Sequence, residues 1–188
     1  MTDYWFVYDL ATGALRWPGT GPEGSATAQV LPEGLGLIDM PFDAYTALTG
    51  AEPDLGPLKL YVKAMVDAAA GVLRKRHITD IPGQQATYLT KAQEAKAWIA
   101  ATDPDPADYP YLRHEADATG QTIAAVAADI VLVAGLWLEG DAMIEGARRG
   151  AAVAIAAATN VAQIVAAARI DWNALLASIA VPPGTPEA

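Results

Sequence analysis

The spacing of apolar residues changes once along the chain, from alternation before residue 41 to helical spacing after residue 57. Alternating aromatic and β-branched residues separated by turn residues are typical of short antiparallel strands. Residues 1–41 therefore predict a small antiparallel β-meander or hairpin module. Its strands are expected in "YWFVYDL" (4–10), "ATGALRW" (11–17, after a turn at Thr12-Gly13), "ATAQVL" (26–31) and "LGLIDM" (35–40), with a loop at 19–25 and a turn at 32–34.

Residues 58–180 carry the spacing of helices, and they predict an α-helical domain. In the first expected helix, 58–77, one side collects the apolar stripe Leu58, Tyr61, Val62, Met65, Ala69 and Val72. Residues 42–57 are expected to form a linker with one turn of helix, and residues 181–188 an extended tail. The predicted fold class is α+β: a small N-terminal antiparallel β module followed by a mostly α-helical bundle or coiled-coil-like region.

Three breaks are expected within the helical region, near 79–83, 102–106 and 120. Pro82 lacks an N–H and cannot continue a helix, so the chain is expected to turn there before a new helix at 84–101. Asp105 before Pro106 is a typical N-cap with a first-turn proline. Gly120 is placed to end one helix, and Thr122 to cap the next.

The longest apolar segment begins at Ile123 and keeps a spacing of three and four residues through Ile144 and beyond. Glycine costs about 1 kcal/mol in a helix interior relative to alanine. The glycines at 135, 140, 146 and 150 therefore predict either a break near Gly140 or a close approach of helices. From residue 160 to 180 the chain is expected to continue as helix, with a kink before Asp171.

Alanine-rich helices bury little apolar area each, so a partner is expected to supply part of the core. This argument predicts a homo-oligomer whose helix–helix seam is formed by Ile123, Ile130, Trp137 and Ile144. In the alternative, the chain's own helices at 58–77 and 84–101 cover the same stripe. Trp5 and Trp17 are either core anchors or exposed docking residues on the small sheet.

Residues 122–138 approach the length of a membrane span, but Asp129 lies in their middle. We therefore expect a helix buried between other helices, without stable membrane insertion. The N-terminus lacks the pattern of a signal peptide. The net charge of −10 argues against a nucleic-acid partner. The chain has no cysteine, which excludes disulfides and thiolate metal sites.

No arrangement of residues predicts catalysis, a cofactor or a metal, and we expect the chain not to be an enzyme. His77 and His114 lie on different elements, and neither Ser25 nor Ser178 has the flanking glycines of a nucleophile elbow. A carboxylate site among Glu139, Asp141 and Glu145 remains the catalytic alternative, and Glu145 with Arg149 is expected to form a helical ion pair. The basic residues 74–77 favour a helix C-terminus, with an anion or partner site as the alternative.

Three blocks of the sequence resemble a family of small structural proteins of tailed bacteriophages, encoded among tail-tip and tail-fibre genes. They are "YWFVYDLATGALRWPGTGPEGS" (4–25), "ITDIPGQQATYLTKAQEAKAWIA" (78–100) and "DPADYPYLRHEADATGQTIAAVAADI" (105–130) continuing to "IEGARRGAAVAIAAA" (144–158). The resemblance implies a structural role without a catalytic motif.

From this resemblance we expect a component of the tail tip or tail fibre that works by protein–protein assembly and contributes to host attachment. Its expected partners are other phage tail proteins and further copies of itself, with a trimer as the first expectation because tail fibres are commonly trimeric. Its expected location is the virion tail, and the host cytoplasm during assembly. The alternatives are a tail-fibre assembly chaperone absent from the mature virion, and a small helical membrane-active or enzymatic protein.

Overall fold

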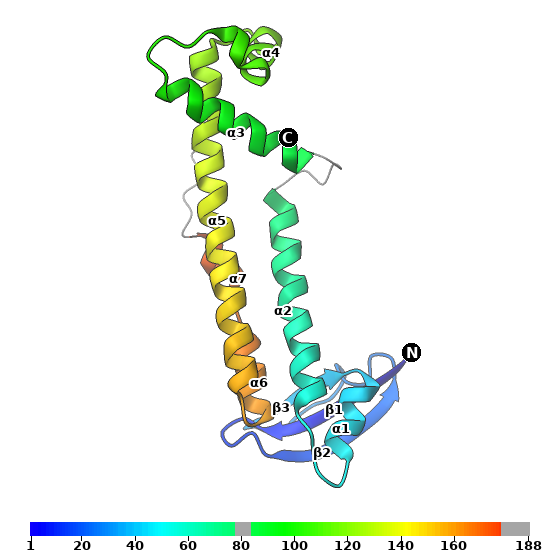
Figure 1. Ribbon diagram of the computed structural model, residues 1–188. Helices are drawn as coiled ribbons and strands as arrows, with labels where there is room; N and C mark the ends of the chain where they lie inside the picture. Colours follow the sequence, from blue (N-terminus) through cyan, green and yellow to red (C-terminus); the bar gives the residue numbers. More distant parts are fainter. Residues whose placement is uncertain (78–83, 178–188) are drawn as a thin grey trace. The chain divides into compact units, whose positions relative to one another are not determined.

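The computed structural model describes residues 1–77 and 84–177 and has an α+β fold, as predicted (Figure 1). A three-stranded antiparallel sheet is followed by helices. The expected turn at 79–83, the helix end at 178–180 and the tail at 181–188 lie outside the described residues. The elements are β1 (Thr2–Asp9), β2 (Leu15–Pro22), β3 (Leu35–Met40), α1 (Phe42–Thr49), α2 (Gly56–His77), α3 (Gln84–Ala100), the 3-10 helix η1 (Pro106–Asp108), α4 (Pro110–Thr119), α5 (Ile123–Ala157), α6 (Val161–Ala168) and α7 (Trp172–Ala177).

The chain divides into two compact units. Unit 1 contains residues 1–71 and 145–172, and unit 2 contains residues 72–144 and 173–188. The predicted domain boundaries at 41 and 58 both fall inside unit 1, so the sheet shares a unit with helices from both ends of the sequence.

In unit 1 the strands lie in the order β2-β1-β3, and β1 pairs antiparallel with both neighbours. Since side chains alternate along a strand, β1 contributes to two cores. Phe6 and Tyr8 face the helices of unit 1, whereas Trp5 and Val7 face a small cluster with Ala26.

Two glycines let the aromatic side chains of β1 lie across the sheet. Gly19 is opposite Trp5 in the β1–β2 register, and a Cβ at residue 19 would collide with the indole ring. Gly36 is opposite Tyr8 on β3, where a Cβ would lie 2.7 Å from the ring atom Cζ. The prediction of a loop at 19–25 is therefore wrong for residues 19–22, which are part of β2. As an edge strand, β2 can also include prolines.

Residues 26–31 do not form the predicted strand. The backbone N–H of Ala26 donates to the carboxylate of Asp3 at 3.1 Å, rather than to a neighbouring strand. Ala26 and Leu31 instead pack over Trp5 and Val7. The small-apolar alternation that suggested a strand here belongs to a loop that covers one face of the sheet.

The helix α1 occupies the first half of the predicted linker, and it buries Ala44 and Leu48. It contributes to the main core of unit 1, which is formed by the sheet, α1, α2, the end of α5, and α6. The fully buried members include Tyr8, Leu58, Ile155, Val161 and Ile164.

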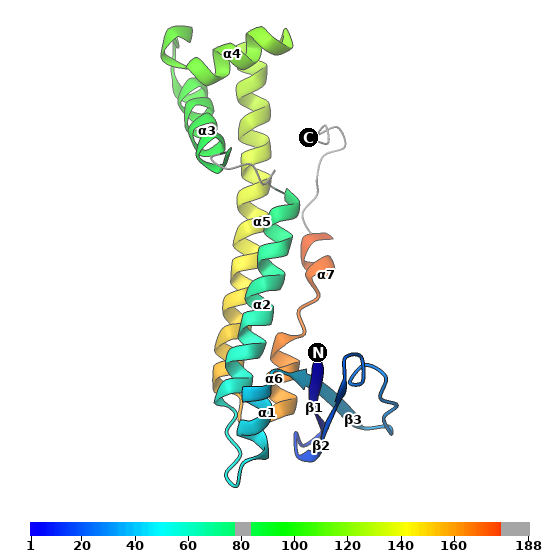
Figure 2. The same ribbon diagram turned by 90° about the vertical axis from the view of Figure 1, so that its right-hand side faces the viewer.

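Unit 2 has a smaller core, in which α3 and α4 pack on the first turns of α5 (Figure 2). Its buried residues are Ala95, Leu112, Ala116, Val126 and Ala127.

The predicted helix ends in unit 2 are confirmed. The Asp105 carboxylate accepts the N–H of Ala107 at 2.9 Å, and Gly120 adopts a left-handed φ of 73°. The hydroxyl of Thr122 accepts the N–H of Ala125 at 3.2 Å. The Asp105 and Thr122 side chains satisfy N–H groups that a helix start leaves without intrahelical partners.

The helix α5 is continuous for 35 residues, so the expected break near Gly140 is wrong. Among the described residues, nothing would lie within 4 Å of a Cβ at Gly135, Gly146 or Gly150, whereas Gly140 itself is buried. The helix ends instead before Asn160, where the side-chain oxygen accepts the N–H of Gln163 at 3.0 Å and starts α6. The helical path from 160 onward is interrupted at residues 169–171, which is where the kink before Asp171 was expected.

Candidate interaction surface

Two of the predicted interface residues are buried within the chain. Trp5 is 6% exposed because its ring lies over Gly19 and is covered by the 26–31 loop. Ile144 is 2% exposed. Neither side chain presents a surface to a partner, which corrects their assignment as docking and seam residues. Trp17 is 44% exposed and remains a candidate docking residue on β2.

The rest of the predicted seam also points inward. Ile123 and Ile130 are half-buried and pack against the unit 2 core formed with Ala95 and Leu112. Trp137 is half-buried. Where the seam meets the unit 2 core, α3 and α4 pack against it. The 84–101 helix of the alternative therefore covers part of the stripe, whereas no described residue of the 58–77 helix belongs to this core. Any partner of α5 must therefore contact a different face.

The opposite face of α5 is exposed, and six of its eight residues are uncharged. We define the outer face as its exposed residues at alternating spacings of three and four: Leu132, Gly135, Glu139, Ala142, Gly146, Arg149, Val153 and Ala156. Only 17% of the most apolar 18-residue window of α5 is buried. The expectation of a helix buried between other helices is therefore wrong for most of this window.

By length and composition, α5 is the one helix among the described residues that could cross a membrane. Buried core helices of soluble proteins pass the same test, but they have their apolar residues covered. Asp129 is exposed on this helix, where a bilayer would have to accommodate its charge. The membrane alternative is treated below as an outcome of the experiments.

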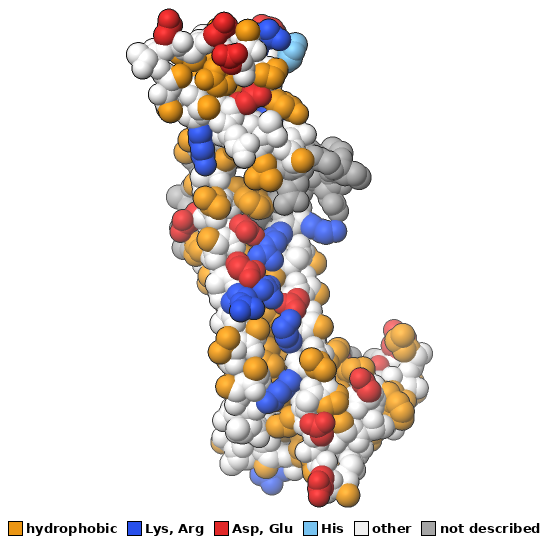
Figure 3. Space-filling model, in the orientation of Figure 1, with side chains coloured by type: hydrophobic (Ala, Val, Ile, Leu, Met, Phe, Trp, Pro, Cys, Tyr) orange, Lys and Arg blue, Asp and Glu red, His pale blue; other side chains and the backbone are white. Residues whose placement is uncertain are grey.

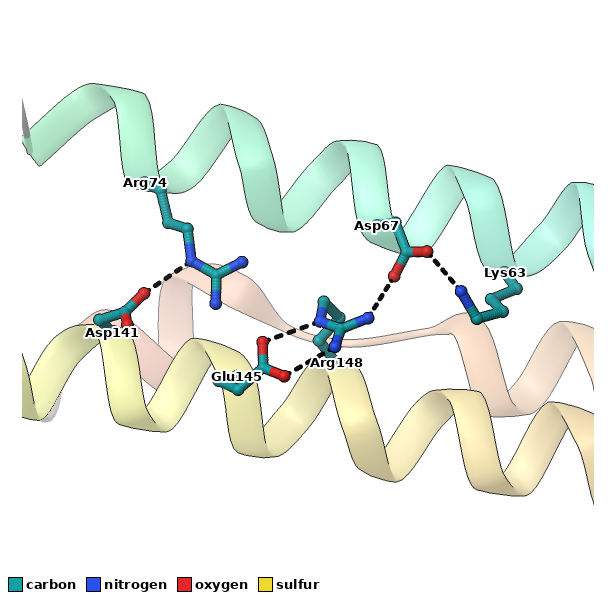
Figure 4. Close-up of polar contacts among 6 residues, drawn as sticks. All are labelled: Lys63, Asp67, Arg74, Asp141, Glu145 and Arg148. Carbon is teal, nitrogen blue, oxygen red and sulfur yellow. Dashed lines mark hydrogen bonds and ion pairs between the residues drawn. The ribbon is translucent and has the colours of Figure 1, made fainter. Parts of the chain in front are cut away.

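A network of ion pairs joins α2 and α5 within unit 1 (Figure 4). The Lys63 ammonium donates to Asp67 at 2.6 Å, and the Arg148 guanidinium donates to the other Asp67 oxygen at 2.7 Å. Arg148 also binds both carboxylate oxygens of Glu145, at 2.8 and 2.7 Å. The partner of Glu145 is therefore Arg148, one residue from the predicted Arg149.

These contacts shift the pKa values of the groups involved. The Lys63 and Arg148 hydrogen bonds lower the pKa of Asp67, while Glu145 and then Asp67 raise the pKa of Arg148. Opposite charges in contact favour the ionised form of each group. The network keeps its charges at neutral pH and serves to align two helices, since its carboxylates are already occupied by cations.

At the basic C-terminal end of α2, Arg74 also forms an ion pair with a carboxylate. In unit 2, Arg74 donates to Asp141 at 2.6 Å. The side chains of Arg76 and His77, which belong to the predicted cationic cluster, lie outside the described residues. Figure 3 shows basic side chains along α2 and α5 beside acidic ones, as these ion pairs require.

A shallow groove in unit 2 lies between α3 and α4, but its charged groups bind one another. Lys91 pairs with Glu115 across it. The nearby Glu94 accepts the backbone N–H groups of Tyr111 at 2.9 Å and Leu112 at 3.3 Å, which caps the start of α4. The groove is lined by Thr87, Lys91, Pro110, Tyr111, His114 and Glu115.

Over the described ranges 1–77 and 84–177, no group of three His, Cys, Asp or Glu side chains is arranged to hold a metal ion. The best-defined chemical feature of these residues is instead the exposed apolar surface, above all the outer face of α5. No family model, curated protein or solved structure matches this chain.

Proposed function

We propose that this protein is a structural component of a bacteriophage tail, at the tail tip or tail fibre, and that it works by protein–protein assembly and contributes to host attachment. The observation that carries the proposal is the exposed outer face of α5, a helix whose most apolar 18-residue window is only 17% buried. Extended apolar surfaces on soluble proteins mark sites of association, because leaving them in water is unfavourable.

The phage association is supported by the resemblance described above. Its second block supplies α3, and its third block supplies α4 and most of α5. These blocks therefore include the core of unit 2 and the second half of the outer face, from Gly146 to Ala156. A family that works by assembly is consistent with a surface of this kind.

The proposed partners are other tail proteins and further copies of this chain. A net charge of −10 disfavours a polyanionic partner such as nucleic acid. A trimer remains the expectation from the resemblance, but it would need contacts other than the predicted seam, whose Ile144 is buried within the chain. A two-fold contact between copies closes a dimer, so a trimer would need a further, separate contact. The proposed location is the virion tail, reached from the host cytoplasm during assembly.

Mass spectrometry of gradient-purified phage particles tests the proposal. The expected result is this protein in the particles at a fixed ratio to a major tail protein. A protein absent from particles, whose deletion nevertheless leaves tails without fibres, would be an assembly chaperone instead. A protein that stays with the membrane fraction and needs detergent for extraction would be membrane-active, and the proposal would be wrong.

A matched pair of variants links the result to the exposed apolar side chains of α5. Leu138 is one of them, although it lies outside the outer face as defined. Leu138→Glu places a charge on an exposed apolar side chain of α5, whereas Gln93→Glu adds the same charge at an exposed position of α3. Incorporation into particles is expected to fall severalfold for Leu138→Glu and to stay unchanged for Gln93→Glu. Equal incorporation of both variants would remove α5 from the proposed contact.

A further inference from the structure

The outer face of α5 has the spacing of a coiled-coil surface. Its residues follow one another at intervals of three and four along a single continuous helix, so their common direction follows from the helix itself. Leu132 is 51% exposed and Val153 is 66% exposed, although both are large and apolar. The remaining apolar members of the face are glycine or alanine, which allow another helix to approach closely.

Two members of the face carry opposite charges. Glu139 and Arg149 are both exposed, and no ion pair or hydrogen bond of either side chain occurs among the described residues. This distinguishes Arg149 from its neighbour Arg148, which is held by Glu145 and Asp67. An unpaired acid and an unpaired base on an apolar face indicate what a covering helix must supply.

A second copy of α5 in antiparallel orientation supplies it. When residue 142 of one copy lies opposite residue 146 of the other, residue 139 lies opposite 149, residue 135 opposite 153, and residue 132 opposite 156. Antiparallel coiled coils pair alternate heptad positions in this manner. Each layer then combines complementary residues: Glu139 with Arg149, Gly135 with Val153, Leu132 with Ala156, and Ala142 with Gly146.

Parallel pairing lacks this complementarity. It would place Glu139 against Glu139 and Arg149 against Arg149, and like charges across an interface are unfavourable. It would also place Gly135 against Gly135, leaving a void beside the layers that hold Leu132 and Val153. Size and charge along the face therefore both select the antiparallel arrangement.

We propose that two copies of this chain associate through a two-fold, antiparallel contact between their outer faces. The contact extends about 36 Å, from Leu132 to Ala156, at the α-helical rise of about 1.5 Å per residue. A two-fold contact uses the same patch on both partners, so each Glu139–Arg149 pair occurs twice. This inference specifies one partner of the assembly function proposed above and rests on that function for its biological role.

Cross-linking tests the orientation, because the natural chain has no cysteine. The variants Gly135→Cys and Val153→Cys are prepared separately as full chains and oxidised alone or as a mixture. A disulfide-linked dimer is expected only in the mixture, because each introduced thiol lies opposite the other position. Cross-linking of each variant alone indicates parallel pairing, and no cross-linking in any sample indicates no contact; either result overturns the proposal.

Sedimentation of charge variants tests the register. Glu139→Arg is expected to weaken dimerisation about tenfold or more, because it places an arginine opposite Arg149 in each of the two symmetric layers. Arg149→Glu is expected to do the same, and the double variant Glu139→Arg/Arg149→Glu to restore the dimer. Asp129→Arg is the matched control, with the same charge change at an exposed position of α5 outside the outer face.

Failure of the double variant to recover dimerisation would overturn the register. An equal loss of dimerisation in Asp129→Arg would show that the change in net charge, and not the Glu139–Arg149 pair, causes the effect, and it would also overturn the register. These measurements use purified protein and are independent of phage particles. A chain that pairs as described but is absent from particles would contradict the tail function and leave the pairing established. A chain present in particles but monomeric in solution would contradict the pairing and leave the tail function standing.

Discussion

Glycines in this protein have opposite effects on stability according to what surrounds them. At Gly19 a methyl group would collide with the Trp5 ring, whereas at Gly71, inside α2, nothing lies within 4 Å of the added atom. Gly19→Ala is expected to lower the free energy of unfolding by about 1–3 kcal/mol, the usual cost of overpacking. Gly71→Ala is expected to raise it by about 1 kcal/mol through helix propensity.

Urea unfolding followed by circular dichroism measures both values. Equal effects of the two substitutions would show that contact with Trp5 does not determine the role of Gly19.

Asp9 makes the stability of the β1–β2 hairpin depend on pH. The Arg16 side chain, 2.6 Å away, and the Thr12 backbone and hydroxyl lower the pKa of Asp9 from 3.8 to about 2. A lowered pKa stabilises the fold at pH values above 3.8, and this contribution disappears as the pH falls towards 2. Asp9→Asn is therefore expected to be less stable than the natural protein at neutral pH.

The difference between the two proteins is expected to shrink between pH 4 and pH 2, as checked by urea unfolding across that range. A difference that is constant with pH would assign the effect to side-chain packing rather than to charge.

At the scale of elements, Arg148 joins α5 to α2 in unit 1 through its ion pair with Asp67. Removing it leaves the carboxylates of Asp67 and Glu145 without this shared cation. Arg148→Ala is expected to lower the free energy of unfolding by more than the loss of a single exposed ion pair would, because Arg148 contacts two carboxylates. Arg148→Lys is expected to recover less than half, because an ammonium lacks the planar fork that binds both partners.

Urea unfolding at low and high salt is the measurement. A loss in Arg148→Ala that salt leaves unchanged would indicate packing of the arginine side chain as its cause.

The elements whose position depends on local chemistry were predictable from the sequence. Gly120 ends α4 and Thr122 caps α5 because these effects involve residues one to four apart. The extent of β2 was not predictable, since its glycines are explained by Trp5 on the neighbouring strand. Asn160 was missed although it is a good N-cap, because the surrounding alanines suggested an uninterrupted helix.

The candidate surface was predictable in kind but not in position. Helical spacing pointed to α5 as a candidate for association, but two opposite stripes on it both have this spacing. Periodicity alone cannot show which stripe the chain covers by itself. Ile144 carried the stronger apolar signal and is buried for that reason, whereas the outer face consists largely of glycine and alanine.

At the scale of the whole molecule, the sheet and helices of unit 1 are expected to unfold together. Ile164 of α6 is fully buried in the core that also contains Phe6 of β1 and Val62 of α2. Ile164→Val is expected to cost about 0.5–1.5 kcal/mol and to speed hydrogen exchange in all three elements. Exchange in α3 and α4 is expected to stay unchanged.

Val126→Ala, in the core of unit 2, is the reciprocal control, and it is expected to affect α3 and α4 but not the sheet. Exchange measured by mass spectrometry on peptides from each element gives the answer. A response confined to α6 in Ile164→Val would contradict a shared core.

The exposed apolar helix also has a consequence for how much of the protein a cell retains. A chain whose α5 is left uncovered presents to proteases and chaperones the kind of surface by which they recognise incomplete molecules. Copies made in excess of their partners would be degraded, while assembled copies would be protected. The steady-state amount of this protein would then follow the supply of its partners, and the ratio of components would be set after translation rather than by the rate of synthesis.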